Sequence, residues 1–427
     1  MQGKLEYYFD RLFPICRSLT GDGNRKTLEI LSEIIPLKIS EIPCGTQCFD
    51  WTVPPEWNVK DAWIKDSKGN FIVNFADNNL YLLGYSEPFA GIISYKELKE
   101  HLYTLPDYPN QIPYLTSYYK RRWGFCVRHR DLERFDPAEK YEIYIDSSLN
   151  ENGSMTIAEV IIEGQTRDEV LFSTYFCHPS LANNELSGPL VSTFICNSLA
   201  GIIKERRAKL KYTYRFVFIP ETIGSIYYLS QMGEHLKKRL KAGFVITCIG
   251  DRGAFTYKKS RQGNALPDRV IELLLQQTEK EYKIMDFFPS DGSDERQYCS
   301  PGFNLPVGSL MRSMYGTYPE YHTSADNKEF ISFAAMEASI YKYLEAIKMI
   351  EQMPFCEPQL GKRGLYPTLG SQKDTSKIVA AMMWLLNFCD GEHDLIDISW
   401  RSGTPFMELL PVVDKLVENG ILKTQVK

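Results

Sequence analysis

The stretch from Leu171 to Gly188, LFSTYFCHPSLANNELSG, constrains the fold more than any other part of the chain. Its first seven residues are an apolar run of strand length, rich in aromatic and β-branched side chains, which predicts a buried β-strand. Because proline cannot extend a sheet ladder, this strand has to stop at His178 and Pro179. The next residues are small and polar, and a helical pattern begins at Gly188. A histidine therefore stands at the carboxyl end of a strand, before a helix.

Ligands of open α/β sheets bind at the carboxyl ends of the strands, and a neutral imidazole there is a good zinc ligand. A lone histidine can also be a structural residue in a capped loop. The residues at the ends of the other strands are therefore needed to decide between these two interpretations. The strand-like segment Tyr212–Pro220 is followed by Glu221, and the segment GFVITCIGD ends at Asp251. Strands alternating with helices predict a mixed or parallel sheet, so we expect His178, Glu221 and Asp251 to line one crevice.

A second histidine, His322, lies in the polar loop YPEYHTSADN before the last helix of this region. A hydrolytic zinc ion needs about three nitrogen or oxygen ligands and an open position for water. It also needs a nearby carboxylate that takes the proton of that water. His178, Asp251 and His322 supply such a ligand set, with Glu221 as the base. Taken alone, Glu221 is also explained as a carboxylate stabilised by a helix dipole.

Composition narrows the possible partners. A chain of 427 residues is too long for one ordinary core, and its formal net charge of −5 offers no bulk attraction to nucleic acid or acidic lipid. The amino terminus lacks a signal-peptide pattern, and no stretch has the length and apolarity of a membrane span. The ten cysteines show no repeated close pairs, as in reduced proteins. We therefore expect a cytoplasmic protein with no membrane partner.

Changes in sequence texture predict four parts. We expect a discontinuous α/β catalytic domain at 1–37 and 126–352, and a β-rich insertion at 38–125, where short strand-like runs alternate with turns. A linker rich in Pro and Gly follows at 353–370, and 371–427 reads as a winged helix-turn-helix. This last part has six basic and eight acidic residues, a net charge of −2. That balance favours a protein partner or a homo-oligomer contact over DNA.

Several motifs together resemble a known family. HPSLANNELSG, PETIGS, the pair Gly250-Asp251, SDERQY and YHTSADN resemble the successive motifs of co-catalytic zinc aminopeptidases of the bacterial leucyl and aminopeptidase Y types. The whole chain is more similar to bacterial aminopeptidase-like proteins associated with polysaccharide biosynthesis. The resemblance implies a zinc-aminopeptidase-like mixed sheet of roughly eight strands between helices, with an inserted β-rich domain and a C-terminal winged helix. It implies cleavage of an amide bond in a peptide or an amino-sugar derivative.

Carried over by position, the resemblance assigns four roles. His178 matches the histidine of the first zinc site, and Asp251 matches the aspartate of that site. His322 matches the histidine of the second site, and Glu221 matches the general base.

Two positions depart from the active-enzyme pattern. The bridging aspartate falls on Asn184, with Glu185 next to it, and the second-site glutamate falls on Thr222. An amide is a weak bridge between two cations and a threonine is hardly a ligand, so we expect one Zn²⁺ rather than two, with Asn184 and Glu185 as further candidate ligands. The alternative is a catalytically impaired binding or scaffold protein that retains the fold.

The irregular segment 292–320 and the tyrosines that end it are expected to shape a substrate pocket. The arginines there could bind a carboxylate or an anionic sugar group, whereas its acidic residues are either substrate-facing or a surface charge run. The candidate substrate-binding residues are Asp294, Glu295, Arg296, Arg312 and Tyr321. A third functional class is a ligand-sensing regulator that uses the winged helix to read DNA.

Overall fold

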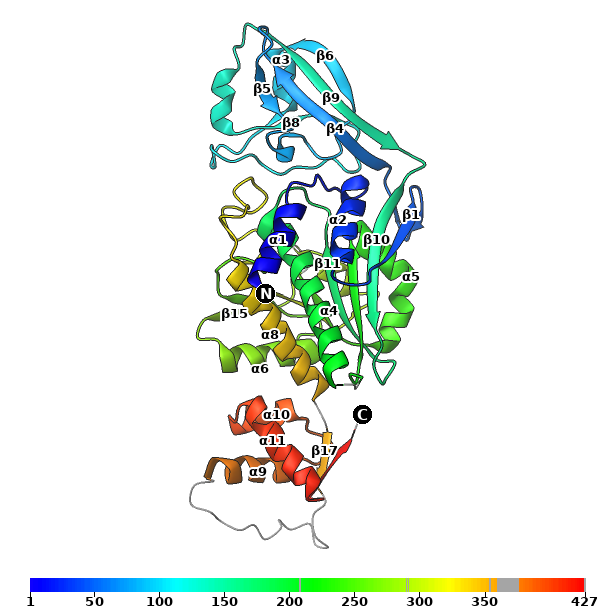
Figure 1. Cartoon of the computed structure of the whole chain (residues 1–427), viewed down its shortest axis with the longest axis vertical. Coiled ribbons are helices and arrows are strands. Elements are labelled where there is room, and N and C mark those ends of the chain that lie inside the picture. The colour runs from blue at the N-terminus through cyan, green and yellow to red at the C-terminus, as the bar shows by residue number, and fades with distance from the viewer. Residues whose placement is uncertain (207–208, 289, 291, 353–354, 359–375, 426–427) are drawn as a thin grey trace. The chain divides into compact units, whose positions relative to one another are not determined.

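The structure is a computed structural model that describes residues 1–206, 209–288, 290, 292–352, 355–358 and 376–425 (Figure 1). The chain forms two compact units. Unit 1 comprises Met1–Pro267 and Lys283–Lys342, and unit 2 comprises Asp268–Tyr282 and Tyr343–Lys427.

Unit 1 contains a mixed eight-stranded sheet, which confirms the predicted α/β fold class. The strand order is β1-β10-β12-β11-β13-β16-β14-β15. The inner strands from β12 to β16 pair in parallel, whereas β1, β10 and β14 run antiparallel to their neighbours. The bounds are Lys38–Pro43 (β1), Ser154–Ile162 (β10), Glu169–Tyr175 (β11), Thr213–Ile219 (β12), Leu240–Val245 (β13), Phe255–Lys258 (β14), Tyr282–Met285 (β15) and Val307–Met311 (β16).

The apolar run before His178 becomes β11, and all seven of its residues are buried. Helix α4 packs against β11 and β12, α2 against β10, and α5 against β13. The segment Ala182–Glu205 is long and apolar enough to cross a membrane, but 67% of its most apolar window is buried inside the protein. The helical elements are α1 (Gln2–Leu12), α2 (Asp22–Ser32), the π-helical turn η4 (Ala182–Leu186), α4 (Ser187–Arg206), α5 (Ile223–Arg239), α7 (Glu295–Tyr298) and α8 (Phe333–Glu351).

The insertion carries a separate sheet of four strands in the order β5-β4-β9-β6. Its bounds differ from the predicted 38–125, because β1 belongs to the large sheet and β9 belongs to the small one. Strand β9 alternates buried and exposed residues at its start, as in a sheet with one solvated face. The elements are β2 (Gln47–Cys48), β3 (Trp51–Thr52), β4 (Glu56–Lys65), β5 (Phe71–Asn74), η1 (Asn79–Tyr81), β6 (Phe89–Ser94), α3 (Tyr95–Leu98), η2 (Lys99–His101), β7 (Leu102–Tyr103), β8 (Phe125–Cys126), η3 (His129–Arg134) and β9 (Lys140–Asn150).

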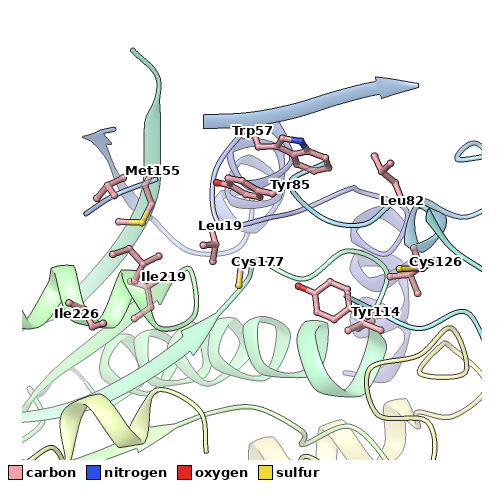
Figure 2. Close-up of a cluster of buried hydrophobic side chains, with 14 of the residues drawn as sticks. Leu19, Trp57, Leu82, Tyr85, Tyr114, Cys126, Met155, Cys177, Ile219 and Ile226 are labelled. Carbon is pink, nitrogen blue, oxygen red and sulfur yellow. The ribbon is translucent and has the colours of Figure 1, made fainter. Parts of the chain in front are cut away.

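One hydrophobic cluster runs from the large sheet into the insertion (Figure 2). It joins Ile219 and Ile226 of the α/β part with Trp57, Tyr85 and Tyr114 of the insertion. Trp57 stacks on Tyr85 with ring centroids 5.7 Å apart. The insertion is therefore part of unit 1, and its core is continuous with that of the α/β part.

Unit 2 contains the predicted winged helix-turn-helix. Its helices are α6 (Leu266–Thr278, from Asp268 in this unit), α9 (Ser376–Phe388), α10 (Leu395–Ser402) and α11 (Phe406–Glu418), and strands β17 (Phe355–Pro358) and β18 (Leu422–Gln425) pair antiparallel. Arg269 of α6 donates to Asp394 and Asp397 at 2.6 and 3.0 Å. The predicted linker 353–370 therefore includes a strand, and its residues 353–354 and 359–370 lie outside the described part.

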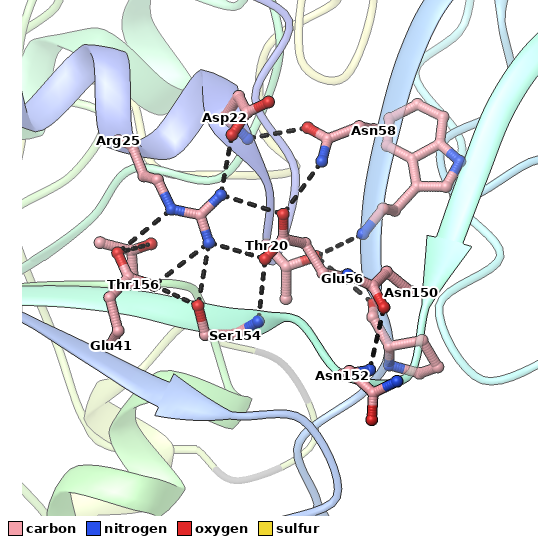
Figure 3. A network of polar contacts seen from close by, with 12 residues as sticks. Thr20, Asp22, Arg25, Glu41, Glu56, Asn58, Asn150, Asn152, Ser154 and Thr156 are labelled. Atoms are coloured by element: carbon pink, nitrogen blue, oxygen red, sulfur yellow. Dashed lines mark hydrogen bonds and ion pairs between the residues drawn. The ribbon is translucent and has the colours of Figure 1, made fainter.

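Arg25 on α2 joins the strands by which the chain enters and leaves the insertion (Figure 3). Its guanidinium donates to Glu56 of β4 at 2.6 and 2.9 Å, to Glu41 of β1 at 3.2 Å and to Ser154 of β10 at 2.9 Å. The hydrogen bond from Arg25 holds the pKa of Glu56 below its usual value. The ion pair is therefore part of what fixes the small sheet relative to the large one.

We predict that Arg25→Met lowers the free energy of unfolding by about 2 kcal/mol at neutral pH, because two carboxylates lose their partner. The pKa of Glu56 is lowered in the folded state, so its stabilisation is present above its unfolded pKa and is lost as pH falls through the folded value. Thermal unfolding should therefore show a gap between wild type and variant that shrinks on acidification. The exposed neighbour Lys26→Met is the control, with a near-zero effect. A gap that does not change with pH contradicts this account.

Candidate active site

His178 lies directly beyond β11 and is held between two carboxylates. Its Nδ1 lies 2.6 Å from Oε2 of Glu185, and its Nε2 lies 3.5 Å from Oε2 of Glu221. The side chains of His178 and Glu185 are 5% and 0% exposed, whereas that of Glu221 is 27% exposed. Burial disfavours the imidazolium, but Glu185 and Glu221 outweigh it and raise the pKa of His178 to about 10. The imidazole thus has a closed side at Nδ1 and an accessible side at Nε2.

The closed side depends on the π-helical turn η4, which points Glu185 back at His178. Asp326 fixes this turn by accepting the amide protons of Asn183 and Asn184 at 2.6 and 2.9 Å. Behind the pair, the buried Arg17 donates to the carbonyl of His178 at 3.0 Å and lies 3.9 Å from Oε1 of Glu185. These contacts fix both the carboxylate and the backbone of the histidine.

Glu221 follows β12, as the sequence predicted. Ser293 Oγ donates to its Oε1 at 2.7 Å, which leaves Oε2 directed at His178. Burial alone would raise the pKa of Glu221, but the hydrogen bond and charge of His178 and the hydrogen bond of Ser293 hold this pKa below its usual value. Glu221 is therefore an ionised carboxylate beside the accessible nitrogen of an imidazole.

His322 comes to the same place from a distant loop. Its ring centroid lies 5.6 Å from that of His178, and Tyr321 stacks on it at 3.9 Å. Burial and the charge of His178 lower the pKa of His322 to about 3, so its imidazole is neutral. The structure therefore brings together His178, Glu221 and His322, with Tyr321 against the second histidine.

The insertion supplies a residue that sequence reasoning missed. Tyr114 meets His178 and His322 edge-on, with ring centroids 4.9 and 5.1 Å away. Its amide donates to the carbonyl of His322 at 2.8 Å, and Pro113 forms a β-bridge with Thr323. Tyr114 lies in the tyrosine-rich stretch IPYLTSYY at residues 112–119, but a sequence does not reveal which distant loop such a stretch contacts.

Asp251 does not group with the two histidines as the sequence predicted. Its carboxylate accepts hydrogen bonds from Asn183 Nδ2 at 2.9 Å, from the amide of Gly253 at 2.6 Å, and from the amide and hydroxyl of Ser313 at 3.0 and 2.8 Å. The ligand atoms of His178, Asp251 and His322 do not all lie within 4.8 Å of one another. The reason is that β13 ends at Val245, well before Asp251, so this aspartate braces a loop.

The two other candidate ligands differ from each other. Glu185 is engaged with Nδ1 of His178 and supports that residue. Asn184 donates through Nδ2 to Tyr175 at 3.0 Å, while its Oδ1 is buried and has no hydrogen-bond partner within the described part of the chain. Cys177, His178 and Glu185 form a compact group of potential metal ligands. Burial raises the pKa of the Cys177 thiol well above its usual value, so this thiol is protonated and packs in the interior.

The two acidic residues predicted to face the substrate point into the interior of the protein. Asp294 is fully buried, accepts hydrogen bonds from the amide of Thr222 and the hydroxyl of Ser225, and has a pKa raised to about 8 by burial and by Glu221. Glu295 is fully buried in an ion pair with Lys258 at 2.9 Å.

The two predicted arginines differ from each other. Arg312 donates to Ser339 and to the carbonyls of Gly253 and Ala335, so it braces the fold. Arg296 is exposed. The sequence SDERQY was not a surface charge run, because α7 turns its two acidic residues into the interior.

Comparison with known proteins identifies the relatives of the chain. A family model described as a domain of unknown function, DUF4910, matches residues 7–353, and a winged helix-turn-helix model matches residues 348–424. A Clostridium acetobutylicum relative, named as a polysaccharide biosynthesis protein with an aminopeptidase-like domain, is 46% identical over 428 residues, which cover 99% of this chain and 96% of the relative.

Solved structures show the same fold. A crystal structure of a Clostridium acetobutylicum protein described as a peptidase has a TM-score of 0.91 and 43% identity, covering 99% of this chain and 96% of its own. BSAP, a zinc aminopeptidase from Bacillus subtilis, has a TM-score of 0.58 at 12% identity, covering 82% and 93%. The second likeness concerns the fold alone, and it confirms the predicted aminopeptidase-like architecture.

The buried pair of Glu295 and Lys258 can be tested for its structural role. We predict that Lys258→Met lowers the free energy of unfolding by about 3–5 kcal/mol, because it leaves a buried carboxylate without its cation. Adding Glu295→Gln to this variant should restore part of the loss. Chemical denaturation measures both values. If Lys258→Met is as stable as wild type and only weakens substrate binding, Glu295 faces the substrate after all.

Proposed function

This chain belongs to the aminopeptidase-like family that the DUF4910 model describes, and we propose that it is a hydrolase that cleaves an amide bond in a peptide or an amino-sugar derivative. The name of the Clostridium relative supports a place in polysaccharide biosynthesis. The observation that carries the proposal is the arrangement of His178. A buried carboxylate backs its Nδ1, and an ionised, partly exposed carboxylate faces its Nε2 at 3.5 Å.

We further propose that the site holds one zinc ion. Glu185 on Nδ1 of His178 is the carboxylate–histidine arrangement that fixes the tautomer of a metal ligand and leaves Nε2 for the metal. His322 is neutral, as a ligand imidazole must be, whereas His178 is protonated and would release its Nε2 proton when the ion binds. The amide oxygen of Asn184 is a buried acceptor without a partner among the described residues. His178, His322 and this amide oxygen would hold the ion. The neutral residues Asn184 and Thr222 do not fit a second one.

The chemistry then follows from the charges of the side chains. A bound zinc ion lowers the pKa of its water and polarises the carbonyl of the substrate. Glu221 would accept the proton of the attacking water and pass it to the leaving amine, which is the role of a general base that becomes a general acid. Ser293 holds one oxygen of Glu221 and so directs the other toward the reacting centre. Tyr114 packs on both imidazoles and limits their movement.

We predict about one zinc ion per chain by elemental analysis. Glu221→Gln should keep the zinc and lose activity on aminoacyl nitroanilides or N-acyl amino sugars by about 10²–10⁴-fold, because the base is gone. His178→Ala and His322→Ala should lose the zinc, whereas His393→Ala, which removes an imidazole from unit 2, should keep zinc and activity. A protein without stoichiometric zinc in which His178→Ala changes nothing would falsify the proposal.

The neutral side chains at 184 and 222 favour one competing function, a binding or scaffold protein that no longer cleaves its ligand. The double variant Asn184→Asp/Thr222→Glu separates the two cases. If the natural chain is inactive and hydrolysis appears only in the double variant, the protein binds without cleaving.

For the winged helix of unit 2 we propose a protein partner or a second copy of the chain. Helix α11 exposes Glu408, Asp414 and Glu418 against one lysine, Lys415, and such a surface repels phosphate. The nine cysteines whose side chains the structure describes are free thiols, which supports a cytoplasmic location. We predict no binding of duplex DNA in a mobility-shift assay at low salt. A shifted complex that dissociates as salt rises would instead support the DNA-reading regulator.

A further inference from the structure

A cavity of about 250 Å³ lies in the insertion. Three of the segments that line it matter here. Pro54 and Pro55 come from the chain between β3 and β4, Tyr118 and Tyr119 come from the turn that follows Tyr114, and Leu149 comes from the end of β9. None of the residues just named belongs to the proposed ligand set or takes part in the proposed chemistry.

Aromatic rings at this cavity are exposed although they are held in place. Tyr119 is 53% exposed, and its ring meets that of Trp51, which is 41% exposed, at 5.5 Å. The hydroxyl of Tyr119 donates to the carbonyl of Thr52 at 3.3 Å, which ties the ring to β3. Fixed, exposed aromatic faces mark a binding surface. With proline rings beside them, they suit a ligand that has both an apolar face and hydroxyl groups, as a pyranose has.

The rim of the cavity carries positive charge. Lys120 is exposed, and within the described part of the chain its ammonium has neither a hydrogen bond nor an ion pair. Arg121 lies beside it and pairs with Glu151 at 2.8 Å. Arg121 also lies 3.8 Å from Glu87, so its charge is balanced by carboxylates. The ammonium of Lys120 is therefore the cation that can pair with a ligand, and it favours a ligand with a negative charge.

Tyr118 connects the cavity with the candidate active site. It lines the cavity, and its hydroxyl lies 2.9 Å from the hydroxyl of Tyr114. The ring of Tyr114 contacts both His178 and His322. A ligand in the cavity is therefore separated from the imidazoles by two hydrogen-bonded tyrosines.

We propose that this cavity is a subsite for one acidic pyranose residue of the substrate, stacked on Tyr119 and paired with Lys120. This proposal rests on the proposed function, because the substrate meant is the one that the proposed hydrolase cleaves. It narrows the substrate class to amide-bearing saccharides that contain a sugar with a carboxylate group. The volume supports a single ring, because drug-sized ligands occupy roughly 300–1,000 Å³.

The test uses the full-length protein with three probes: methyl glucuronoside, methyl glucoside and leucinamide. Binding is followed by calorimetry through the millimolar range. We expect the glucuronoside to bind, the neutral glucoside to bind more weakly, and leucinamide not to bind in the cavity. Tyr119→Ala and Lys120→Ala should each weaken glucuronoside binding about tenfold or more. The exposed residues Tyr108 and Lys96, changed to Ala, are matched controls and should leave it unchanged.

Glu221→Gln separates this proposal from the proposed function. If Glu221→Gln binds the glucuronoside like wild type, the subsite stands even where no hydrolysis is found. If hydrolysis depends on Glu221 but no glucuronoside binds, or Tyr119→Ala binds it unchanged, the subsite is overturned. Equal binding of glucoside and glucuronoside overturns the acidic part of the proposal. Thermal unfolding of each variant checks that it is folded.

Discussion

The hydrogen bond between Glu185 and Nδ1 of His178 is the contact on which the site depends. It is fully buried, backed by Arg17, and fixed by the turn that Asp326 holds. Because this carboxylate occupies one nitrogen of the ring, the other nitrogen can only face Glu221 and the more open side of the site. A buried carboxylate without a partner would be costly, so the histidine and the glutamate keep each other in place.

The neighbouring positions 184 and 185 give the site its particular character. In the zinc aminopeptidases that the motifs resemble, the bridging carboxylate is expected at 184. Here 184 is an amide and the carboxylate is at 185, where it supports a histidine from behind. A shift of one residue in a tight turn changes which direction a side chain faces. The carboxylate at 185 orients His178, whereas the amide at 184 carries no charge.

The insertion is part of the site as well as part of the fold. Its core is continuous with that of the α/β part, and Arg25 forms an ion pair with Glu56 of the small sheet. Tyr114 of the insertion packs against the imidazoles of His178 and His322. The sequence predicted the α/β fold, the winged helix, and the meeting of His178, Glu221 and His322, since strand ends and turn residues leave strong local patterns. It failed at Asp251, because the apolar run after Val245 is buried loop, which has the same composition as a strand. Tyr114 and Arg17 act through contacts between distant segments, which local patterns do not encode.

The central claim is that this chain holds one metal ion between His178 and His322. A crystal of the zinc-loaded protein, with diffraction recorded at the zinc absorption edge, tests it most directly. The account predicts a single anomalous peak that adjoins both His178 and His322. Two peaks, a peak at Asp251, or no peak in the presence of zinc would contradict it.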